Sequence, residues 1–148
     1  MTSKELQQYL LREFPQENAC CEWKEMKNLK NSFAGDEKND VISYVSAIAN
    51  MEGGYLVIGV QDKTLEIVGT DLTKFNLNAQ SAVWKLIEHC TNLSSEGLSI
   101  NEYITEDTQK TVWVIHIPKH LPRRPVYAHK KAWQRVEDSL VEMTQERL

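Results

Sequence analysis

The stretch that decides the fold is Ile48-Ala49-Asn50-Met51-Glu52-Gly53-Gly54-Tyr55-Leu56-Val57-Ile58-Gly59-Val60. Its first residues close a helix that Asp40 can cap and that carries an apolar stripe. The paired glycines then end the helix, since a residue without Cβ permits a tight turn. Asn50 is expected to anchor that same turn through hydrogen bonds from its side chain to the backbone. The nearly continuous apolar run over 55–60 predicts a central strand buried on both faces.

The chain before this stretch predicts one helix and one strand. Residues 2–14 begin with a capping-box pattern, Thr-x-x-Glu, and then repeat apolar residues at three- and four-residue spacings, which is typical of an amphipathic helix. Pro15 ends that helix. Residues 19–26 alternate as a strand does, so Cys21 and Trp23 would face one side and the charged residues next to them the other.

The chain after this stretch predicts a short strand, a helix, an antiparallel hairpin, two short edge strands and a closing helical turn. The short strand is expected at Leu65–Val68, and the helix begins after a cap at Asn76 or Asn78. The hairpin is expected at Leu98–Thr105 with Thr111–Ile117. The edge strands are expected at Val126–Ala128 and Ala132–Val136, and the helical turn within 137–148. Three prolines between 118 and 125 make the segment before the edge strands a loop. A buried central strand beside antiparallel hairpins indicates the α/β class, or α+β in some vocabularies, with a mixed, largely antiparallel sheet flanked by helices.

The bulk composition indicates one soluble globular domain over residues 1–148. Of the 148 residues, 41% are hydrophobic and 26% are charged, near the globular average. No apolar run approaches the roughly 18 to 20 residues that a membrane helix needs. The N-terminus lacks the apolar core of a signal peptide, so we expect a cytoplasmic protein without a membrane partner. The three cysteines lack the ligand spacing of a zinc site and are expected as reduced thiols.

Basic residues are concentrated in one part of a chain whose net charge is -4. Residues 108–136 contain seven Lys and Arg and no acid, whereas the rest contains 10 basic and 21 acidic residues. This asymmetry predicts a basic face for nucleic-acid phosphates, although a flexible loop with solvated charges would give the same count. Tyr127 and Trp133 could stack on bases or pack into the core. The candidate contacts are Lys119, Arg123, Arg124, Lys130, Lys131, Arg135 and Tyr127.

A second candidate site combines carboxylates with one lysine. Glu22 and Lys24 would share the polar side of the first strand, Glu17 precedes it, and Asp62 follows the central strand. Carboxylates from two strand ends can hold Mg²⁺ or Mn²⁺, because hard cations prefer oxygen ligands, and the lysine could bind a phosphate oxygen. Judged by spacing alone, Glu17 and Glu22 are more simply interpreted as solvated surface residues.

Several motifs together resemble the Schlafen/AlbA-like domain. They are Glu17-x4-Glu22-Trp23-Lys24, the runs 44–50 and 52–62, Ile67-Val68-Gly69, Arg124-Pro125-Val126-Tyr127 and Trp133-Gln134-Arg135-Val136. The resemblance covers residues 17–136, and its Ala-Ile-Ala-Asn-x-Glu-Gly-Gly core is specific. Members of that family include bacterial proteins described as DNA-binding transcriptional regulators and animal Schlafen proteins, some of which are RNA endonucleases.

The resemblance implies a DNA or RNA partner and a set of site residues. In the nucleases three acids carry catalysis, and the matching positions are Glu17, Glu22 and Asp62, with Lys24 beside them. Nuclease cores pair two such domains and add a zinc-binding element, so a single copy would need to form a homodimer to build a comparable groove. Some relatives carry names linked to ATP binding, but the chain has no GxxxxGK[ST] motif. Bacterial relatives usually continue into a larger C-terminal part, so we expect these residues to be the N-terminal domain of a longer protein.

Two functions from different classes follow from these features. The preferred one is a nucleic-acid-binding domain of a transcriptional regulator, because resemblance transfers a scaffold more safely than an activity. The alternative is a divalent-metal-dependent endoribonuclease that acts on structured RNA such as tRNA. A protein-interaction domain that uses neither site is a weaker alternative.

Overall fold

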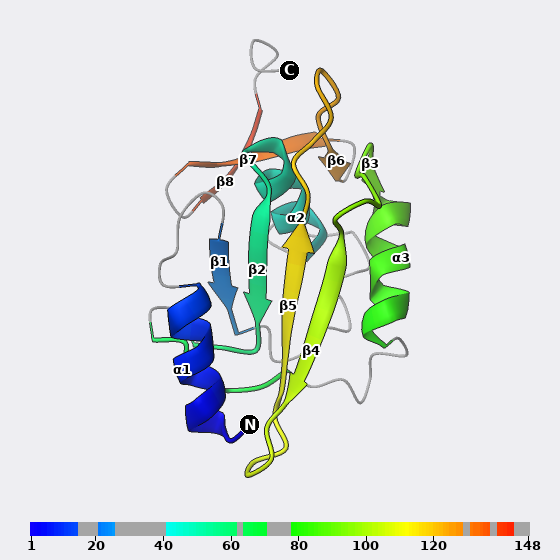
Figure 1. The fold of residues 1–148 in the computed structure, drawn as a ribbon. Coiled ribbons are helices and arrows are strands. Elements are labelled where there is room, and N and C mark those ends of the chain that lie inside the picture. Colours follow the sequence, from blue (N-terminus) through cyan, green and yellow to red (C-terminus); the bar gives the residue numbers. More distant parts are fainter. Residues whose placement is uncertain are drawn as a thin grey trace.

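The computed structural model describes residues 1–14, 21–25, 41–61, 64–70, 78–128, 131–136 and 139–143. Along these residues the elements are α1 Ser3–Glu13, β1 Cys21–Lys24, α2 Val41–Asn50, β2 Gly54–Ile58, α3 Ala79–His89, β3 Cys90–Thr91, β4 Ser99–Ile104, β5 Thr111–Ile117, β6 Tyr127–Ala128, β7 Lys131–Val136 and β8 Ser139–Glu142. The strands form two sheets, in the orders β1-β2-β5-β4 and β3-β6-β7-β8, which Figure 1 shows with the helices. This confirms the α+β class.

β2 is the central strand that the apolar run predicts. It lies between β1, to which it is parallel, and β5, to which it is antiparallel. Leu56, Val57 and Ile58 are buried, so both faces of the strand are covered, as a continuous apolar sequence requires. β4 and β5 form the predicted antiparallel hairpin, with Ser99 opposite His116.

α2 lies between the two sheets, and all ten of its residues are buried. It contacts β2 and β5 of the first sheet and β6, β7 and β8 of the second. The apolar stripe predicted for this helix therefore understates its burial, because a second sheet covers the side that a stripe would leave to water. Polar side chains on such a helix must find hydrogen bonds inside the protein, and Ser46 Oγ donates to Val126 O at 2.7 Å.

The second sheet corrects two predictions for the last part of the chain. The sequence predicts β6 and β7 as edge strands, but both lie inside the sheet, since β3 pairs with β6 and β8 pairs with β7. The closing helical turn is wrong for residues 139–142, which form β8 and pair with β7 from Val136 opposite Ser139 to Trp133 opposite Glu142. Very short strands carry too little periodicity to be recognised locally, and their pairing partners decide their structure.

α1 covers the face of the first sheet opposite to α2 (Figure 1). Leu6 and Leu10 pack in one buried cluster with Cys21 and Trp23 of β1. The two residues that alternation assigns to one side of β1 therefore do face α1, and the alternate residues of that strand point toward α2.

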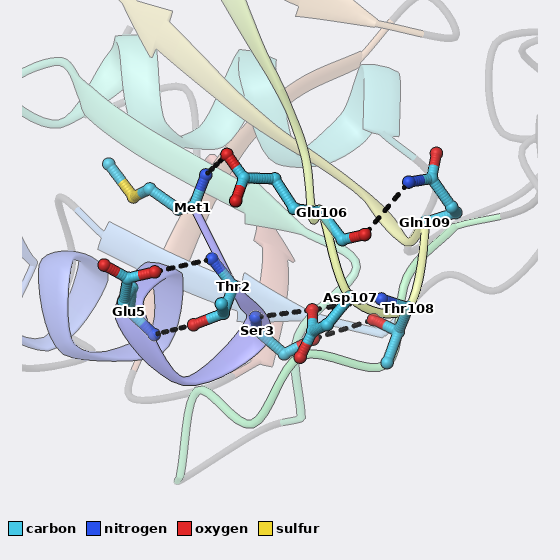
Figure 2. Close-up of polar contacts among 8 residues, drawn as sticks. All are labelled: Met1, Thr2, Ser3, Glu5, Glu106, Asp107, Thr108 and Gln109. Carbon is cyan, nitrogen blue, oxygen red and sulfur yellow. Dashed lines mark hydrogen bonds and ion pairs between the residues drawn. The ribbon is translucent and has the colours of Figure 1, made fainter.

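The start of α1 is tied to the turn between β4 and β5, as Figure 2 shows. The capping box forms as predicted: Thr2 Oγ1 accepts from Glu5 N at 3.2 Å, and Thr2 N donates to Glu5 Oε1 at 2.9 Å. Asp107 Oδ1 accepts from Ser3 N at 2.9 Å, and this hydrogen bond holds the pKa of the Asp107 carboxyl below its usual range. The N-terminal amine lies 3.1 Å from Glu106 Oε1. These contacts fix the helix to one end of the hairpin.

The remaining local predictions are met in part. Asn78 caps α3, with its Oδ1 2.8 Å from Ser81 N, while the cap predicted at Asp40 lies outside the described residues. The short strand predicted at Leu65–Val68 is present as a single antiparallel bridge between Val60 and Ile67. Among the residues that the structure describes, no helix has the length and apolar character to cross a membrane.

Gly53 permits the turn from α2 into β2. Its φ of +76° lies in the left-handed region, which costs residues with a Cβ roughly 1–2 kcal/mol. An added Cβ would also lie 2.7 Å from Lys119 N and 2.8 Å from Ile117 O, so the backbone would have to move. Gly97 offers a comparison, since its φ is +84° but the nearest atom to an added Cβ is Pro118 Cβ at 3.5 Å.

Gly53→Ala should therefore destabilise the protein more than Gly97→Ala. Both changes place alanine in a left-handed backbone, at roughly 1–2 kcal/mol, but only the first adds a clash with backbone atoms, at roughly 1–3 kcal/mol more. Urea unfolding of the wild type and both variants measures the difference in free energy of unfolding. Equal losses would show that the close approach of the 117–119 backbone has no energetic importance.

Candidate nucleic-acid interface and carboxylate site

Strand β1 presents a carboxylate and an ammonium on its α2 side. Glu22 is only 2% exposed, and its Oε1 lies 3.6 Å from Lys24 Nζ. Lys24 keeps 31% of its side chain exposed, and its Nζ lies 4.8 Å from the centroid of the Tyr44 ring on α2. The interpretation of Glu22 as a solvated surface acid is therefore wrong, because its side chain is buried.

A buried carboxylate, that of Glu22, thus lies next to an ammonium group, that of Lys24, which solvent can reach. Burial of a carboxylate is costly unless a positive group or hydrogen-bond donors compensate it, and Lys24 supplies a positive charge at 3.6 Å. A carboxylate oxygen is also a ligand that Mg²⁺ and Mn²⁺ prefer. The exposed part of Lys24 could bind a phosphate oxygen, so the pair has chemistry suited to a phosphodiester.

The other two members of the predicted carboxylate trio, Glu17 and Asp62, lie outside the described residues. Within 1–14, 21–25, 41–61 and the later described ranges, no three His, Cys, Asp or Glu side chains lie together as metal ligands. Glu22 has the carboxylate oxygens that such a metal site needs. The residues after β2 lie beside the end of β1, because Gly59 N donates a hydrogen bond to Lys24 O at 2.8 Å. The metal site therefore stays a prediction.

Of the predicted contacts that the structure describes, Lys119, Arg123 and Arg124 lie on the connection from β5 to β6, and Lys131 begins β7. Lys110, the first cation of residues 108–136, precedes β5 at the other end of that strand. Lys119 follows β5 with a side-chain exposure of 54%, and Lys131 begins β7 with 52%. Arg123 and Arg124 are exposed between them. Four of the predicted contacts are thus open to a ligand at one end of the molecule.

The aromatic residues of this segment differ in their surroundings. Tyr127 is half-buried on β6, which pairs with the first residues of β7. Trp133 is buried, and its Nε1 donates to Ala128 O at 2.9 Å, so this ring belongs to the core. The two remaining predicted contacts are Arg135, which belongs to β7, and Lys130, which lies outside the described residues.

Asn50 supports this surface, a role that the sequence analysis did not find. Its Oδ1 accepts from Val126 N at 2.7 Å, and its Nδ2 donates to Val126 O at 2.9 Å and to Trp133 O at 2.8 Å. The prediction that it anchors its own turn is therefore wrong, since its side chain binds the second sheet. An amide at the end of a mostly apolar helix is the signal that could have found this role, because a buried amide needs several partners.

His116 lies on the α1 face of β5. Its ring centroid is 4.8 Å from that of Tyr55, and its Nε2 lies 3.1 Å from Asn101 Nδ2. Partial burial lowers the pKa of the imidazole, so the ring is neutral at pH 7. A neutral Nε2 that accepts a hydrogen bond from the amide is consistent with this pKa.

These features define a class of protein: an α+β domain with a helix buried between two sheets, a basic connection at one end and a buried Glu–Lys pair on an edge strand. A family model described as Schlafen, AlbA_2 matches residues 17–144. The chain belongs to the Schlafen AlbA_2 family.

Two solved structures are similar to this chain. The crystal structure of the DIP2311 protein from Corynebacterium diphtheriae has 16% sequence identity and a TM-score of 0.62, over 95% of this chain and 27% of that chain. The solution structure of the N-terminal domain of an ATP-dependent DNA helicase RecG-related protein from Nitrosomonas europaea has 20% identity and a TM-score of 0.47, over 86% of this chain and 80% of that chain. The first likeness shows the fold, and this chain spans 27% of that protein's length.

Lys24→Met should lower the free energy of unfolding. The loss should be smaller in the double variant Lys24→Met/Glu22→Gln. Without the ammonium at 3.6 Å, the buried carboxylate should cost roughly 1–3 kcal/mol, less than in a fully buried pair because Lys24 is partly exposed. A neutral glutamine needs no cation, so the double-mutant cycle should show a coupling of about 1 kcal/mol or more.

Urea unfolding of the two single variants and the double variant measures this coupling. Lys85→Met is the matched control, because Lys85 pairs with Glu88 at 3.7 Å on the exposed side of α3, and it should change the free energy of unfolding by under about 0.5 kcal/mol. A coupling near zero would show that the Glu22–Lys24 pair contributes nothing to stability.

Proposed function

We propose that this chain is a nucleic-acid-binding domain that contacts DNA or RNA through the segment from Lys119 to Arg135. The observation that carries this proposal is the exposure of Lys119, Arg123, Arg124 and Lys131 at one end of the fold, on the β5–β6 connection and at the start of β7 (Figure 1). Residues 108–136 hold seven basic residues and no acid, against a net charge of -4 for the chain. Membership of the Schlafen AlbA_2 family supports the same kind of partner, and the role of a DNA-binding transcriptional regulator within this proposal rests on that likeness.

The lysines at the two ends of the segment are weakly held by acids. Lys119 Nζ lies 3.1 Å from Glu52 Oε2, and Lys131 Nζ lies 3.8 Å from Glu142 Oε2, with all four side chains more than half exposed. Exposed ion pairs contribute roughly 0–1 kcal/mol, so a phosphate could replace either glutamate. Binding of a polyanion would then be driven by release of its counterions and would weaken as salt rises.

A metal-dependent endoribonuclease is the second candidate, and the buried Glu22 beside Lys24 is the observation that favours it. Carboxylates are seldom fully buried unless they are paired or functional. In this proposal Glu17, Glu22 and Asp62 would hold Mg²⁺ or Mn²⁺, and Lys24 would bind the phosphate of the RNA. Carboxylates repel phosphates unless a cation bridges them, so metal dependence separates this function from binding alone.

Binding to labelled tRNA and to single- and double-stranded DNA should weaken steeply as salt rises. The double variant Lys119→Ala/Lys131→Ala should flatten the slope of log affinity against log salt by about 1.4–1.8, because two phosphate contacts are lost. Fluorescence anisotropy in EDTA measures binding without metal-dependent cutting, and Lys85→Ala on α3 is the control for loss of one lysine. Absence of binding at low salt, or an affinity that ignores salt, would contradict the proposal.

Cleavage of tRNA in Mn²⁺ or Mg²⁺ tests the second candidate. Asp62→Ala should abolish cutting while binding remains close to that of the wild type, because the metal ligand acts on the reaction and the basic segment supplies the affinity. Glu88→Ala, which removes an exposed acid from α3, is the control and should cut normally. Cutting that persists in EDTA or in Asp62→Ala would rule out this candidate.

A further inference from the structure

The connection between β5 and β6 reverses direction at a four-residue turn, Leu121-Pro122-Arg123-Arg124, here called the tip turn. Arg124 N donates to Leu121 O at 3.0 Å, and the two residues form an antiparallel bridge. All four residues are exposed, Leu121 at 47%. The connection projects beyond the sheets at the end of the molecule that Figure 1 shows uppermost. The tip turn is therefore available to a partner.

The legs of the connection are held by the body of the protein. On the outgoing leg, His120 N donates to Ala49 O of α2 at 2.9 Å. On the return leg, Pro125 O accepts from Asn92 Nδ2 at 3.1 Å. A turn held at both legs loses little conformational freedom when it binds, which favours affinity.

Arg123 occupies a backbone conformation that favours glycine. Its φ is +59°, in the left-handed region where a residue with a Cβ is uncommon. Pro122 prearranges the turn, yet glycine would complete the same turn without strain. Strained residues cluster at functional sites. The protein has an arginine at this position in spite of the strain, which points to a function for its guanidinium group.

The tip turn combines two guanidinium groups with two apolar side chains. Arginines favour the negative potential of a narrow minor groove, and leucine or proline can act as a wedge between base steps there. Neighbouring strands of a hairpin lie about 4.8 Å apart, against a minor groove about 6 Å wide in B-form DNA. Because that spacing is measured between strand axes, the turn with its backbone atoms is wider than the undistorted groove, and its entry requires an apolar wedge that kinks the duplex and opens the groove.

We propose that the tip turn enters the minor groove of duplex DNA, with Arg123 and Arg124 against the groove and Leu121 as the wedge that bends the duplex. This inference rests on the proposed nucleic-acid-binding function and deepens it by naming B-form DNA as the partner. The exposed cations Lys119, Arg123, Arg124 and Lys131 supply the attraction. Duplex RNA is a poorer partner, because its wide and shallow minor groove lacks the enhanced negative potential with which a narrow groove attracts arginine.

Arg123→Gly tests the turn directly, because it relieves the backbone strain and removes the guanidinium at once. We expect a Tm that is unchanged or higher, together with an affinity for a short A·T-rich duplex that is roughly fivefold lower or more. Leu121→Ala should bind but should reduce the bend, measured by energy transfer between dyes on the two DNA ends. Lys85→Ala is the control and should change neither quantity.

Inosine distinguishes the two grooves. An inosine·C pair lacks the guanine N2 amino group in the minor groove and keeps the acceptors of a G·C pair in the major groove. The wild type should bind an inosine·C duplex more tightly than the G·C duplex, and Arg123→Gly should lose that preference.

Equal affinity for these two duplexes, or tighter binding to duplex RNA of the same sequence, would overturn the minor-groove assignment. Effects of Arg123→Gly and Leu121→Ala no larger than those of Lys85→Ala would overturn the role of the tip turn. Each of these results is compatible with salt-dependent binding that needs Lys119 and Lys131. In that case the proposed nucleic-acid-binding function would be retained and only the inference about the tip turn would fail. A wild type that binds no nucleic acid would overturn both.

Discussion

A buried helix that carries polar side chains constrains the rest of this molecule. All ten residues of α2 are buried between the two sheets, so the hydrogen-bonding groups on the helix must be satisfied by the protein. Asn50 meets this demand by binding the backbone of Val126 and Trp133, and Ser46 shares Val126 O. A buried backbone group that loses its partner costs roughly 1–3 kcal/mol. α2 thus joins the second sheet to the first.

Both candidate sites depend on that helix. On one side, α2 places the Tyr44 ring 4.8 Å from Lys24 Nζ, and Lys24 pairs with the buried Glu22. At its end, Ala49 O accepts from His120 N, and Asn50 holds Val126, so the connection from β5 to β6 starts and finishes on the same turn of α2. The chemistry of the two sites is opposite, since one offers a buried carboxylate and the other exposed cations. A nucleic acid could use both only if a divalent cation bridged the first.

The residue types of the candidate sites could be predicted from the sequence, but their surroundings could not. Alternation along β1 predicts that Glu22 and Lys24 share a side, and that is confirmed through the burial of Cys21 and Trp23 against α1. The same alternation is consistent with a solvated surface, and only the tertiary structure shows that Glu22 is buried. The charge count locates the basic segment, whereas the left-handed backbone of Arg123 is visible only in the structure. Exposure is a property of what packs nearby, and no local pattern contains it.

The sequence by itself determined the elements whose signals are local: the capping box of α1, the continuous apolar run of β2, the hairpin of β4 and β5, and the glycine turn at Gly53. Each depends on residues within a few positions of one another, so spacing and residue type suffice. The tertiary structure alone decided that α2 is buried on every side, that β6 and β7 are inner strands, and that residues 139–142 form β8. These outcomes depend on hydrogen bonds and packing between segments far apart in the chain. Short strands acquire their structure from such partners, because a strand needs a neighbour to satisfy its backbone.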